Sequence, residues 1–376
     1  MIKVIHVISD TNIGGAGTLL LNYLKNFDRG EFDIKVALPG DSALIPRISE
    51  LGYPVIETEG GRDKSFDLRA VGEFMRIFKR EKPDIVHTHS SFSARLAAFL
   101  SGVKSRIYTR HCVFEMPWYL THFPGKQING LVNNTLATRV IAVAEAAKKN
   151  LTDTGVSEKK IDVIINGVEP VRAMSAEEKD DFRRSTGFST EDFVCLISAR
   201  LEEYKGHKYF LDAAAIVAEE DESARFIVMG AGSLEKELRD RAANLGIESK
   251  VLFTGFVTDV APYVNIADLN VNCSYGTETS SLALSEGMSL SKPAVATNYG
   301  GNPYMVEDGE NGFTVPVKDA GALADAIIKI KNDKDLYARM SAAAYKRYTE
   351  KFTATAMTKK LEKIYEEETE RRKLKK

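Results

Sequence analysis

The sequence has only three cysteines and one tryptophan among 376 residues, and it has no long uninterrupted apolar run. The cysteines, Cys112, Cys195 and Cys273, are scattered without the spacing of metal ligands, which argues against a disulfide framework and fits a reducing cytoplasm. No apolar stretch approaches the roughly 20 residues of a membrane-spanning helix, and the N-terminal run lacks a signal-peptide cleavage site. We therefore expect a cytoplasmic protein.

The chain also lacks a strong charge of either sign. Its formal net charge is -2, which gives no reason to expect nucleic acid as a partner. The sequence ends in RRKLKK, and this basic tail indicates either a solvated helix end or a weak peripheral contact with an anionic membrane. Hydrophobic residues make up 44% and charged residues 28%, which is typical of globular proteins, and the length predicts two domains.

Short apolar runs alternate with helical patterns along the whole chain. IKVIHVI, FDIKVALPG, DIVHTHS, RIYTRHC and RVIAVAE are strand-like in the first half, and the pattern restarts at FVCLISAR after a polar segment. Strands of this kind interleaved with helices favour parallel sheets covered on both faces. The sequence thus predicts an α/β fold with domains at 1–168 and 169–353, followed by an amphipathic helix.

Two carboxylates, Glu278 and Glu286, flank the segment TSSLALS. Ser281 and Leu282 lie where a helix is expected to begin, and unpaired backbone N–H groups at a helix start can hold a diphosphate. Glu278 could then accept hydrogen bonds from sugar hydroxyls, and Glu286 from those of a ribose. Considered alone, the pair could equally be two surface carboxylates.

Arg200 and Lys205 follow the apolar run FVCLIS and are therefore expected at the C-terminal end of a strand. Open α/β sheets bind ligands at that edge. Two cations there can neutralise a nucleoside diphosphate and assist its departure. The residues predict a diphosphate site, although two solvated basic side chains would produce the same pattern.

Two glycine clusters, GGAG and GAGS, each follow a predicted strand, as in a dinucleotide-binding fingerprint. Neither completes the G-x-G-x-x-G spacing, because Gly14, Gly15 and Gly17 are too close together. We therefore regard an NAD-dependent dehydrogenase as a minor alternative.

Taken in order, these motifs resemble the retaining glycosyltransferases of family 4, which have the GT-B fold. The matching pieces are GGAG, DIVHTHS, TRHCVF, INGV, SARLEEYKGH, GAGSLEKEL, FTGFV, GTETSSLALSEGMSLSKPAVATNYGG and ENGFTVPV, and they cover almost the whole chain. The resemblance implies two Rossmann-like domains facing across a cleft, with the acceptor in the first and the nucleotide sugar in the second. It also implies that the last helix, 354–376, packs back on the first domain.

The resemblance also implies roles for individual residues. Glu278 corresponds to the glutamate that contacts the transferred sugar, and Glu286 to the one that holds the ribose. The other implied donor contacts are Arg200 and Lys205 on the diphosphate, Ser281 and Leu282 through backbone amides, Phe256 and Val257 on the base, and Gly14 and Gly15 from the first domain. His111, in TRHCVF, matches the histidine near the reacting sugar carbon, so the expected catalytic set is His111, Glu278, Arg200 and Lys205. Where many relatives have Phe and Gly within the Glu-x7-Glu segment, this chain has Thr-Ser-Ser-Leu.

The resemblance implies transfer of a hexosyl group, with retention, from a nucleotide sugar to a hydroxyl of a glycan or lipid-linked acceptor. UDP-sugar is the default donor, and similarity to bacterial envelope and capsule enzymes suggests polysaccharide synthesis. We expect no metal and no cofactor, because Arg200 and Lys205 supply the positive charge. A sugar-nucleotide 2-epimerase of the same fold and a non-catalytic nucleotide-sugar-binding subunit remain alternatives.

Other histidines and aromatic residues are candidates for the acceptor site. His87 and His89 end the strand DIVHTHS, where they are either structural or contact the acceptor. Trp118 and Tyr119 lie in the aromatic segment 112–125, which is either a packed loop or an acceptor-binding or membrane-facing flap. His207 is expected at the surface.

Overall fold

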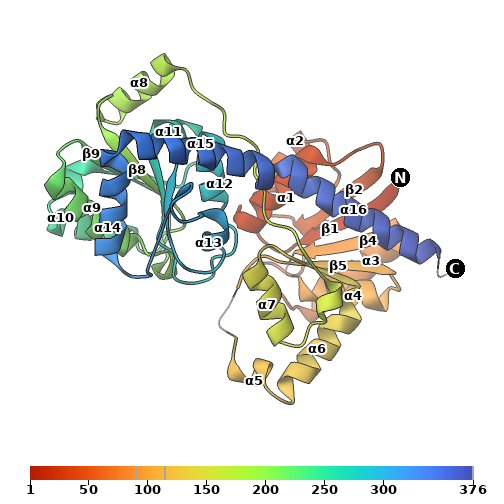
Figure 1. Ribbon diagram of the computed structural model, residues 1–376. Coiled ribbons are helices and arrows are strands. Elements are labelled where there is room, and N and C mark those ends of the chain that lie inside the picture. Colours follow the sequence, from red (N-terminus) through yellow and green to blue (C-terminus); the bar gives the residue numbers. More distant parts are fainter. Residues whose placement is uncertain (90, 114–115, 375–376) are drawn as a thin grey trace. The chain divides into compact units, whose positions relative to one another are not determined.

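The chain forms two compact units, which Figure 1 shows with the residues coloured along the sequence. The computed structural model describes residues 1–89, 91–113 and 116–374. The first unit comprises Met1–Gly167 together with the segment that begins at Ala354, and the second comprises Val168–Thr353. The boundary lies one residue from the predicted one. Residues 114–115 of the aromatic segment and the last two residues of the basic tail lie outside the described residues.

A parallel sheet of seven strands forms the centre of the first unit, in the order β3-β2-β1-β4-β5-β6-β7. Five of the strands are the apolar runs identified in the sequence, and the two edge strands β3 and β7 are additional. They are β1 (Ile2–Ile8), β2 (Phe32–Pro39), β3 (Val55–Thr58), β4 (Ile85–His89), β5 (Ser105–Arg110), β6 (Arg139–Ala142) and β7 (Ile161–Val163). The order changes direction between β1 and β4, which creates a switch point where loops at the C-terminal edge separate.

Helices cover both faces of this sheet, as the near-continuous apolar strands predict. They are α1 (Gly15–Asn26), α2 (Ile45–Glu50), α3 (Leu68–Glu81), α4 (Phe92–Leu100), α5 (Trp118–Thr121), α6 (Gly125–Leu136), α7 (Glu145–Asp153) and α16 (Ala354–Lys373), with a short 3-10 helix η1 (Glu158–Lys160). Alternate residues of β1 separate the two faces. Val4 and Ile8 pack with α1, α2 and α16, whereas Ile5 and Val7 pack with α3 and α4.

The last helix, α16, belongs to the first unit although it follows the second in sequence. In Figure 1 the blue α16 lies beside the red α1, with which it is in contact. Its apolar stripe of Met357, Leu361, Ile364 and Tyr365 is buried in the same cluster as β1 and β2. The amphipathic pattern predicted this helix, and its apolar stripe is the face that is buried in the core of the first unit.

The second unit has a parallel sheet of six strands in the order β10-β9-β8-β11-β12-β13. The strands are β8 (Phe193–Ser198), β9 (Ala224–Met229), β10 (Val251–Gly255), β11 (Leu269–Asn272), β12 (Ala294–Thr297) and β13 (Gly312–Val315). The helices are α8 (Ala176–Ser185), α9 (His207–Glu220), α10 (Glu235–Asn244), α11 (Ala261–Ile266), α12 (Leu282–Ser289), α13 (Asn302–Met305), α14 (Ala320–Asn332) and α15 (Lys334–Lys351), with 3-10 helices η2 (Glu203–Lys205) and η3 (Glu248–Lys250).

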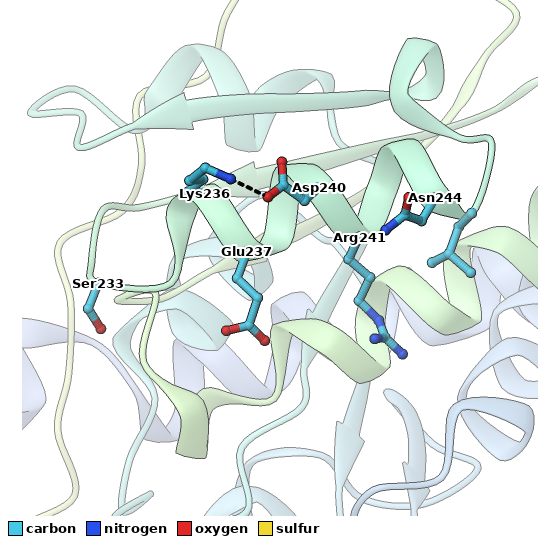
Figure 2. A pocket seen from close by; sticks show the side chains of 7 residues that line it. Ser233, Lys236, Glu237, Asp240, Arg241 and Asn244 are labelled. Atoms are coloured by element: carbon cyan, nitrogen blue, oxygen red, sulfur yellow. Dashed lines mark hydrogen bonds and ion pairs between the residues drawn. The ribbon is translucent and has the colours of Figure 1, made fainter.

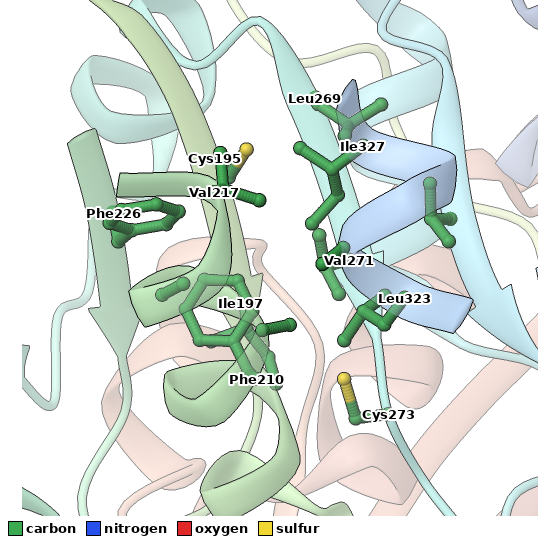
Figure 3. Packing of buried hydrophobic residues seen from close by; sticks show 14 of the residues in the cluster. Cys195, Ile197, Phe210, Val217, Phe226, Leu269, Val271, Cys273, Leu323 and Ile327 are labelled. Carbon is green, nitrogen blue, oxygen red and sulfur yellow. The ribbon is translucent and has the colours of Figure 1, made fainter. Parts of the chain in front are cut away.

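The core of the second unit lies on both sides of this sheet. On one face, shown in Figure 3, Phe210 of α9 and Leu323 and Ile327 of α14 pack against Ile197 and Val271. The buried cysteines Cys195 and Cys273 belong to this cluster, and all three cysteines of the chain are free. Burial raises the pKa of both buried thiols, so they act as small apolar side chains. Among the described residues, no helix is both long and apolar enough to cross a membrane.

Candidate active site

Three predicted site residues of the second unit gather where its strand order changes direction. β8 and β11 are neighbours in the sheet, although β9 and β10 lie between them in the sequence. Arg200 and Lys205 follow the end of β8, and Glu278 follows the end of β11. This switch point is where open α/β sheets leave a crevice for a ligand.

The Lys205 ammonium and the Glu278 carboxylate form an ion pair, with Nζ 2.9 Å from Oε2. The same oxygen accepts hydrogen bonds from the Ser274 hydroxyl at 2.8 Å and the Asn272 amide at 3.3 Å. Burial alone would raise the pKa of Glu278, but the Lys205 charge and these hydrogen bonds together hold the pKa below its ordinary value. Glu278 is therefore a buried acceptor that stays ionised at neutral pH.

Two glycines fix the backbone of the Glu278 loop. Gly300 has a φ of +59° and a Cβ there would lie 2.1 Å from the Glu278 carbonyl oxygen, while a Cβ at Gly301 would lie 1.3 Å from that of Thr279. Only a residue without a side chain allows this approach. The glycines in NYGG thus hold the loop that carries the carboxylate.

The start of α12 lies where the sequence predicts it. Ser281 is the N-cap, and its hydroxyl accepts a hydrogen bond from the Leu284 amide at 3.3 Å. A Cβ at Gly287 would lie 1.6 Å from the Asn270 side chain, and that side chain donates to the Ala283 carbonyl at 3.0 Å, so α12 packs closely on β11. The Ser281 amide donates to Met305 Sδ at 3.0 Å, and the amides of Leu282 and Ala283, in the first turn, have no acceptor within the helix, which suits an anion.

Glu286 lies on the second turn of α12 and is only partly exposed. Its carboxylate has no cation or hydrogen-bond donor among the described residues, and burial raises its pKa to about 7. A carboxylate in such surroundings is stabilised when hydroxyl donors are brought to it.

Arg200 is exposed, and its guanidinium donates to the Tyr204 hydroxyl at 2.7 Å. The backbone around it is held by the second glycine cluster, because a Cβ at Gly230 or Gly232 would lie 2.0 Å from the Ala199 oxygen or 2.5 Å from the Leu201 oxygen. This close packing explains the glycines of GAGS without a dinucleotide.

Phe256 and Val257 follow β10 at the same edge of the sheet. The Phe256 side chain is 63% exposed, whereas Val257 packs partly against the apolar cluster beneath α11. Of the two predicted base contacts, only Phe256 therefore presents a large free apolar surface.

In the first unit, Gly14 is the N-cap of α1 and Gly15 is its first residue. No atom lies within 4 Å of a Cβ built at either glycine, whereas Gly17 is packed against Leu44. The first turn of α1 carries no acidic residue. The helix start is open and suits an anion electrostatically.

A chain of hydrogen bonds links four histidines inside the first unit. His111 Nε2 lies 3.0 Å from His89 Nδ1, and His89 Nε2 lies 3.0 Å from His6 Nδ1. His6 Nε2 lies 3.0 Å from the Tyr365 hydroxyl, which also contacts His87 Nδ1 at 2.6 Å. Burial lowers the pKa of His6 to about 3 and that of His111 to about 4, so the chain is neutral at physiological pH.

The expectation that His87 and His89 contact the acceptor is not met by their placement. Both are buried, at 0% and 1% exposure. The two ring nitrogens of His87 contact the hydroxyls of Tyr365 and Thr109, each at 2.6 Å. Those of His89 contact His6 and His111. They are interior residues because α16 covers this part of β4. His207 is also buried, at 1% exposure, rather than at the surface.

Trp118 and Tyr119 lie on α5 and are 70% and 61% exposed. Trp118 stacks on His122 with ring centroids 4.9 Å apart. The alternative of a packed aromatic loop is therefore wrong for these two residues, which present their rings to the surroundings.

Among the described residues, one cluster of histidines has the composition of a metal site. The nitrogens of His6, His87 and His89 approach within 4.8 Å of one another, but each is already engaged in the hydrogen-bonded chain. The sequence also contains an Asp-x-Asp element at Asp333 and Asp335. Asp333 caps α15 by accepting from the Leu336 amide at 2.9 Å, which is a structural role.

A surface hollow of about 560 Å³ beside α10 is no candidate site (Figure 2). Both of its cations are paired, with Lys236 2.5 Å from Asp240 and Arg241 2.7 Å from Asp212. Pairs of this kind on an exposed helix are typical of a solvated face.

Comparison with known proteins agrees with this geometry. The model described as glycosyl transferases group 1 matches residues 178–347, and the model of glycosyltransferase family 4 matches residues 13–172. The chain belongs to this glycosyltransferase family. It is 27% identical over 354 residues to the putative glycosyltransferase EpsD of Bacillus subtilis, covering 90% of this chain and 91% of the relative.

A second relative of this family-4 glycosyltransferase is the UDP-Gal:alpha-D-GlcNAc-diphosphoundecaprenol alpha-1,3-galactosyltransferase of Escherichia coli. It is 26% identical over 355 residues, or 89% of each chain. Among solved structures, Anabaena HepE in complex with UDP superposes with a TM-score of 0.83 at 22% identity, covering 98% of this chain and 100% of that one. The two sheets with their interleaved helices therefore form the GT-B fold.

Each unit contributes residues around its predicted site positions that the sequence did not indicate. Asn272 and Ser274 hold the Glu278 carboxylate, and Tyr365 connects His6 with His87. Asn272 and Ser274 lie in the same loop as Glu278, so their proximity in sequence was a usable signal. Tyr365 had none, because its partners are more than 270 positions away.

Proposed function

We propose that the chain transfers a hexosyl group, with retention at the anomeric carbon, from a UDP-sugar to a hydroxyl of a glycan or lipid-linked acceptor. The observation that carries the proposal is the buried Lys205–Glu278 pair at the switch point between β8 and β11, close in sequence to the start of α12. A buried carboxylate kept ionised beside a cation suits simultaneous binding of sugar hydroxyls and a diphosphate.

In this assignment, different residues hold the different chemical groups of the donor. Arg200, Lys205 and the amides at Ser281 and Leu282 bind the diphosphate, and Glu278 accepts from hydroxyls of the sugar. Glu286, whose carboxylate has no donor within the described part of the chain, accepts from the ribose hydroxyls, and its raised pKa falls when those donors arrive. Phe256 and Val257 contact the base.

The assignment of a uridine donor draws on relatives. The Escherichia coli relative is named for UDP-Gal, and Anabaena HepE was solved with UDP and with UDP-glucose. The residues of this chain bind a diphosphate and a ribose, which all nucleoside diphosphate sugars share.

We assign a front-face mechanism to the reaction. The bond between the anomeric carbon and the diphosphate oxygen breaks while the acceptor oxygen attacks from the same face, and the departing diphosphate takes the acceptor proton. Lys205 and Arg200 stabilise the charge that develops on the diphosphate. His111, together with Gly14 and Gly15, is assigned to the donor by the family resemblance. No metal is required, since the two cations neutralise the leaving group.

The proposal is tested by a screen of nucleotide sugars without metal, measuring thermal shift and release of nucleoside diphosphate. We expect one sugar nucleotide to raise the melting temperature and to be hydrolysed slowly, both unchanged by EDTA. The matched variants are Lys205→Ala and Lys208→Ala, because Lys208 lies three residues further along the chain, on α9, and pairs with Glu203 on the surface. Lys205→Ala should lose both signals, and Lys208→Ala should keep them.

The other outcomes of the screen either support one of the alternative functions or contradict the proposal. A strict Mg²⁺ requirement contradicts the metal-free mechanism. Conversion of the donor to an epimer without acceptor supports the 2-epimerase, and binding without any turnover in the presence of acceptors supports a nucleotide-sugar-binding subunit. No response to any sugar nucleotide overturns the proposal.

A further inference from the structure

The Glu278 carboxylate is held by protein groups at one of its two oxygens. Its Oε2 accepts from Lys205 at 2.9 Å, from the Ser274 hydroxyl at 2.8 Å and from the Asn272 amide at 3.3 Å. Within the described part of the chain, no donor contacts Oε1. A carboxylate offers about four acceptor positions over its two oxygens, so an oxygen with three donors has none left for a further one. A ligand hydroxyl can therefore be accepted only by Oε1.

The Asn272 amide donates to Glu278 because its other end is engaged. Asn272 Oδ1 accepts from the Ser274 backbone amide at 3.0 Å and from the Asn302 side chain at 3.4 Å. If the amide turned over, its oxygen would face the carboxylate and its NH₂ group would face these two donors. Both new contacts would be repulsive, so the two donors at Oδ1 keep Nδ2 on Glu278.

Asn302 contributes the second of these donors from outside the loop. It is fully buried, at 0% exposure, and it is the first residue of α13. Its Nδ2 also donates to the Thr297 hydroxyl at 3.2 Å, and that hydroxyl donates to the Ser274 carbonyl at 2.5 Å. Asn302 therefore connects β12 and α13 to the strand end that carries Asn272.

The Asn302 side chain is unfavourable for packing alone. Its Oδ1 is buried and finds no donor among the described residues. A buried polar atom without a partner destabilises the folded state, whereas an apolar side chain of similar shape has no such cost. The contribution of Asn302 thus lies in the hydrogen bonds of its Nδ2 rather than in filling space. Just before it, Gly300 and Gly301 hold the backbone of the same Glu278 loop.

We propose that Asn302 is a positioning residue of the donor site, which keeps the Asn272 amide on Glu278 Oε2 and leaves only Oε1 open to a ligand. Because Asn302 is fully buried, it acts through Asn272 and not by contact with the ligand. The proposal rests on the proposed function, which assigns Glu278 to the hydroxyls of the sugar. The diphosphate and the nucleoside are assigned to other groups, so the effect of Asn302 should be confined to the sugar.

The test compares the parent with Asn302→Leu, which removes both polar atoms from a side chain branched at the same carbon. Calorimetric titration measures the affinities for UDP-glucose and UDP, or for the sugar nucleotide that the screen identifies and its nucleoside diphosphate. We expect Asn302→Leu to lose at least tenfold in affinity for the sugar nucleotide and nothing for the nucleoside diphosphate. Asn265→Leu is the matched control. Asn265 is a buried amide of the same unit that bonds to Arg172, Met174 and Ala261, and its loss should leave the ratio of the two affinities unchanged.

A second variant keeps the test decisive if Asn302→Leu fails to fold. Asn302→Ala is smaller, cannot clash, and should show the same selective loss. A double variant of Asn302→Leu with Asn272→Ala tests the route, because it should lose no more than Asn272→Ala alone if Asn302 acts through Asn272. Additive losses, equal losses for both ligands, or native affinity for the sugar nucleotide in the Asn302 variants would each overturn the inference.

The positioning is also measurable without a ligand. In the parent, the Asn272 side-chain amide donates to a carboxylate, so its ¹H–¹⁵N signal, assigned by its loss in Asn272→Ala, should lie downfield. This signal should move upfield in Asn302→Leu, and an unchanged signal would count against the inference. If the parent binds no sugar nucleotide although the signal moves, the proposed function fails and the positioning of Glu278 stands.

Discussion

His89 and His111 share a hydrogen bond of 3.0 Å between Nδ1 and Nε2, and this contact joins the predicted catalytic histidine to the interior of its unit. A neutral imidazole donates through one nitrogen and accepts through the other. His111, His89 and His6, as three neutral imidazoles in series, can therefore be ordered in only two ways, with all their donors pointing toward His111 or all away from it. The position of the proton on His111 is thus coupled to the buried His6 and, through it, to the Tyr365 hydroxyl.

Tyr365→Phe should release this constraint, because it removes the hydroxyl between His6 and His87. We expect the tautomer populations of His111 to change and kcat to fall about tenfold with little change in KM, as when an outer partner of a functional imidazole is lost. Long-range ¹H–¹⁵N spectra of the six histidines report the tautomers directly.

Tyr23→Phe is the matched control for this variant. Tyr23 is also fully buried in the first unit, but its hydroxyl has no partner among the described residues. Native spectra and native kcat in Tyr365→Phe would show that the tyrosine only fills space.

Lys205→Ala and Glu278→Ala should each lower turnover at least a hundredfold, because losing one transition-state contact of this type costs about 2.7–4 kcal/mol. Each change also leaves its buried partner without a counter-charge, so the two losses should not add in the double variant. Steady-state kinetics of the two single variants and the double variant measure the coupling. Additive losses, or near-native turnover in both single variants, would contradict the site assignment.

Glu286→Gln should stabilise the ligand-free protein at high pH. Burial raises the pKa of Glu286 to about 7 from 4.5, so the native state favours the protonated acid. That contribution is complete below pH 4.5 and is lost as the pH rises through about 7. The variant should therefore unfold at a higher denaturant concentration than the parent at pH 8 and at nearly the same one at pH 5.

The same variant should bind nucleotide less tightly, since a neutral amide is a weaker acceptor for ribose hydroxyls than a carboxylate. Equal stability of parent and variant at pH 8 would mean that Glu286 is solvated in the free protein.

Gly301→Ala should impair turnover without touching any ligand. The added Cβ would lie 1.3 Å from the Thr279 oxygen, so the loop that carries Glu278 must move. We expect a destabilisation of about 1–3 kcal/mol and a marked loss of kcat, measured by denaturation and kinetics. Gly72→Ala is the control, because this helical glycine has no atom within 4 Å of a built Cβ, and it should stabilise α3 by about 0.5–1 kcal/mol.

The sequence predicted that Arg200, Lys205 and Glu278 lie at one edge of a sheet, because short apolar strands determine where their C-terminal ends lie. Once FVCLIS and ADLNVN are parallel neighbours, Arg200, Lys205 and Glu278 must reach the same edge. The helix start at Ser281 follows from the capping preference of serine. The ordered set of motifs resembling the family then supplied the roles that spacing alone left open.

The burial of the histidines could not be predicted in this way. Whether a side chain at a strand end is exposed depends on which helix covers that strand, and α16 covers His6 and His87 from the far end of the chain. Arg95 of α4 likewise donates to Asn133 of α6, and no pattern in the sequence links these two helices. Such long-range packing decides between a ligand contact and a structural contact.

The placement of α16 also fixes an order of events during protein synthesis. The core of the first unit needs Met357, Leu361 and Tyr365, which leave the ribosome after every residue of the second unit. The second half of the chain can therefore finish folding while the part of the first sheet that α16 covers is still exposed. A nascent chain stopped before Ala354 would present that apolar surface to chaperones and proteases, so a premature stop even this late would leave the first unit incomplete.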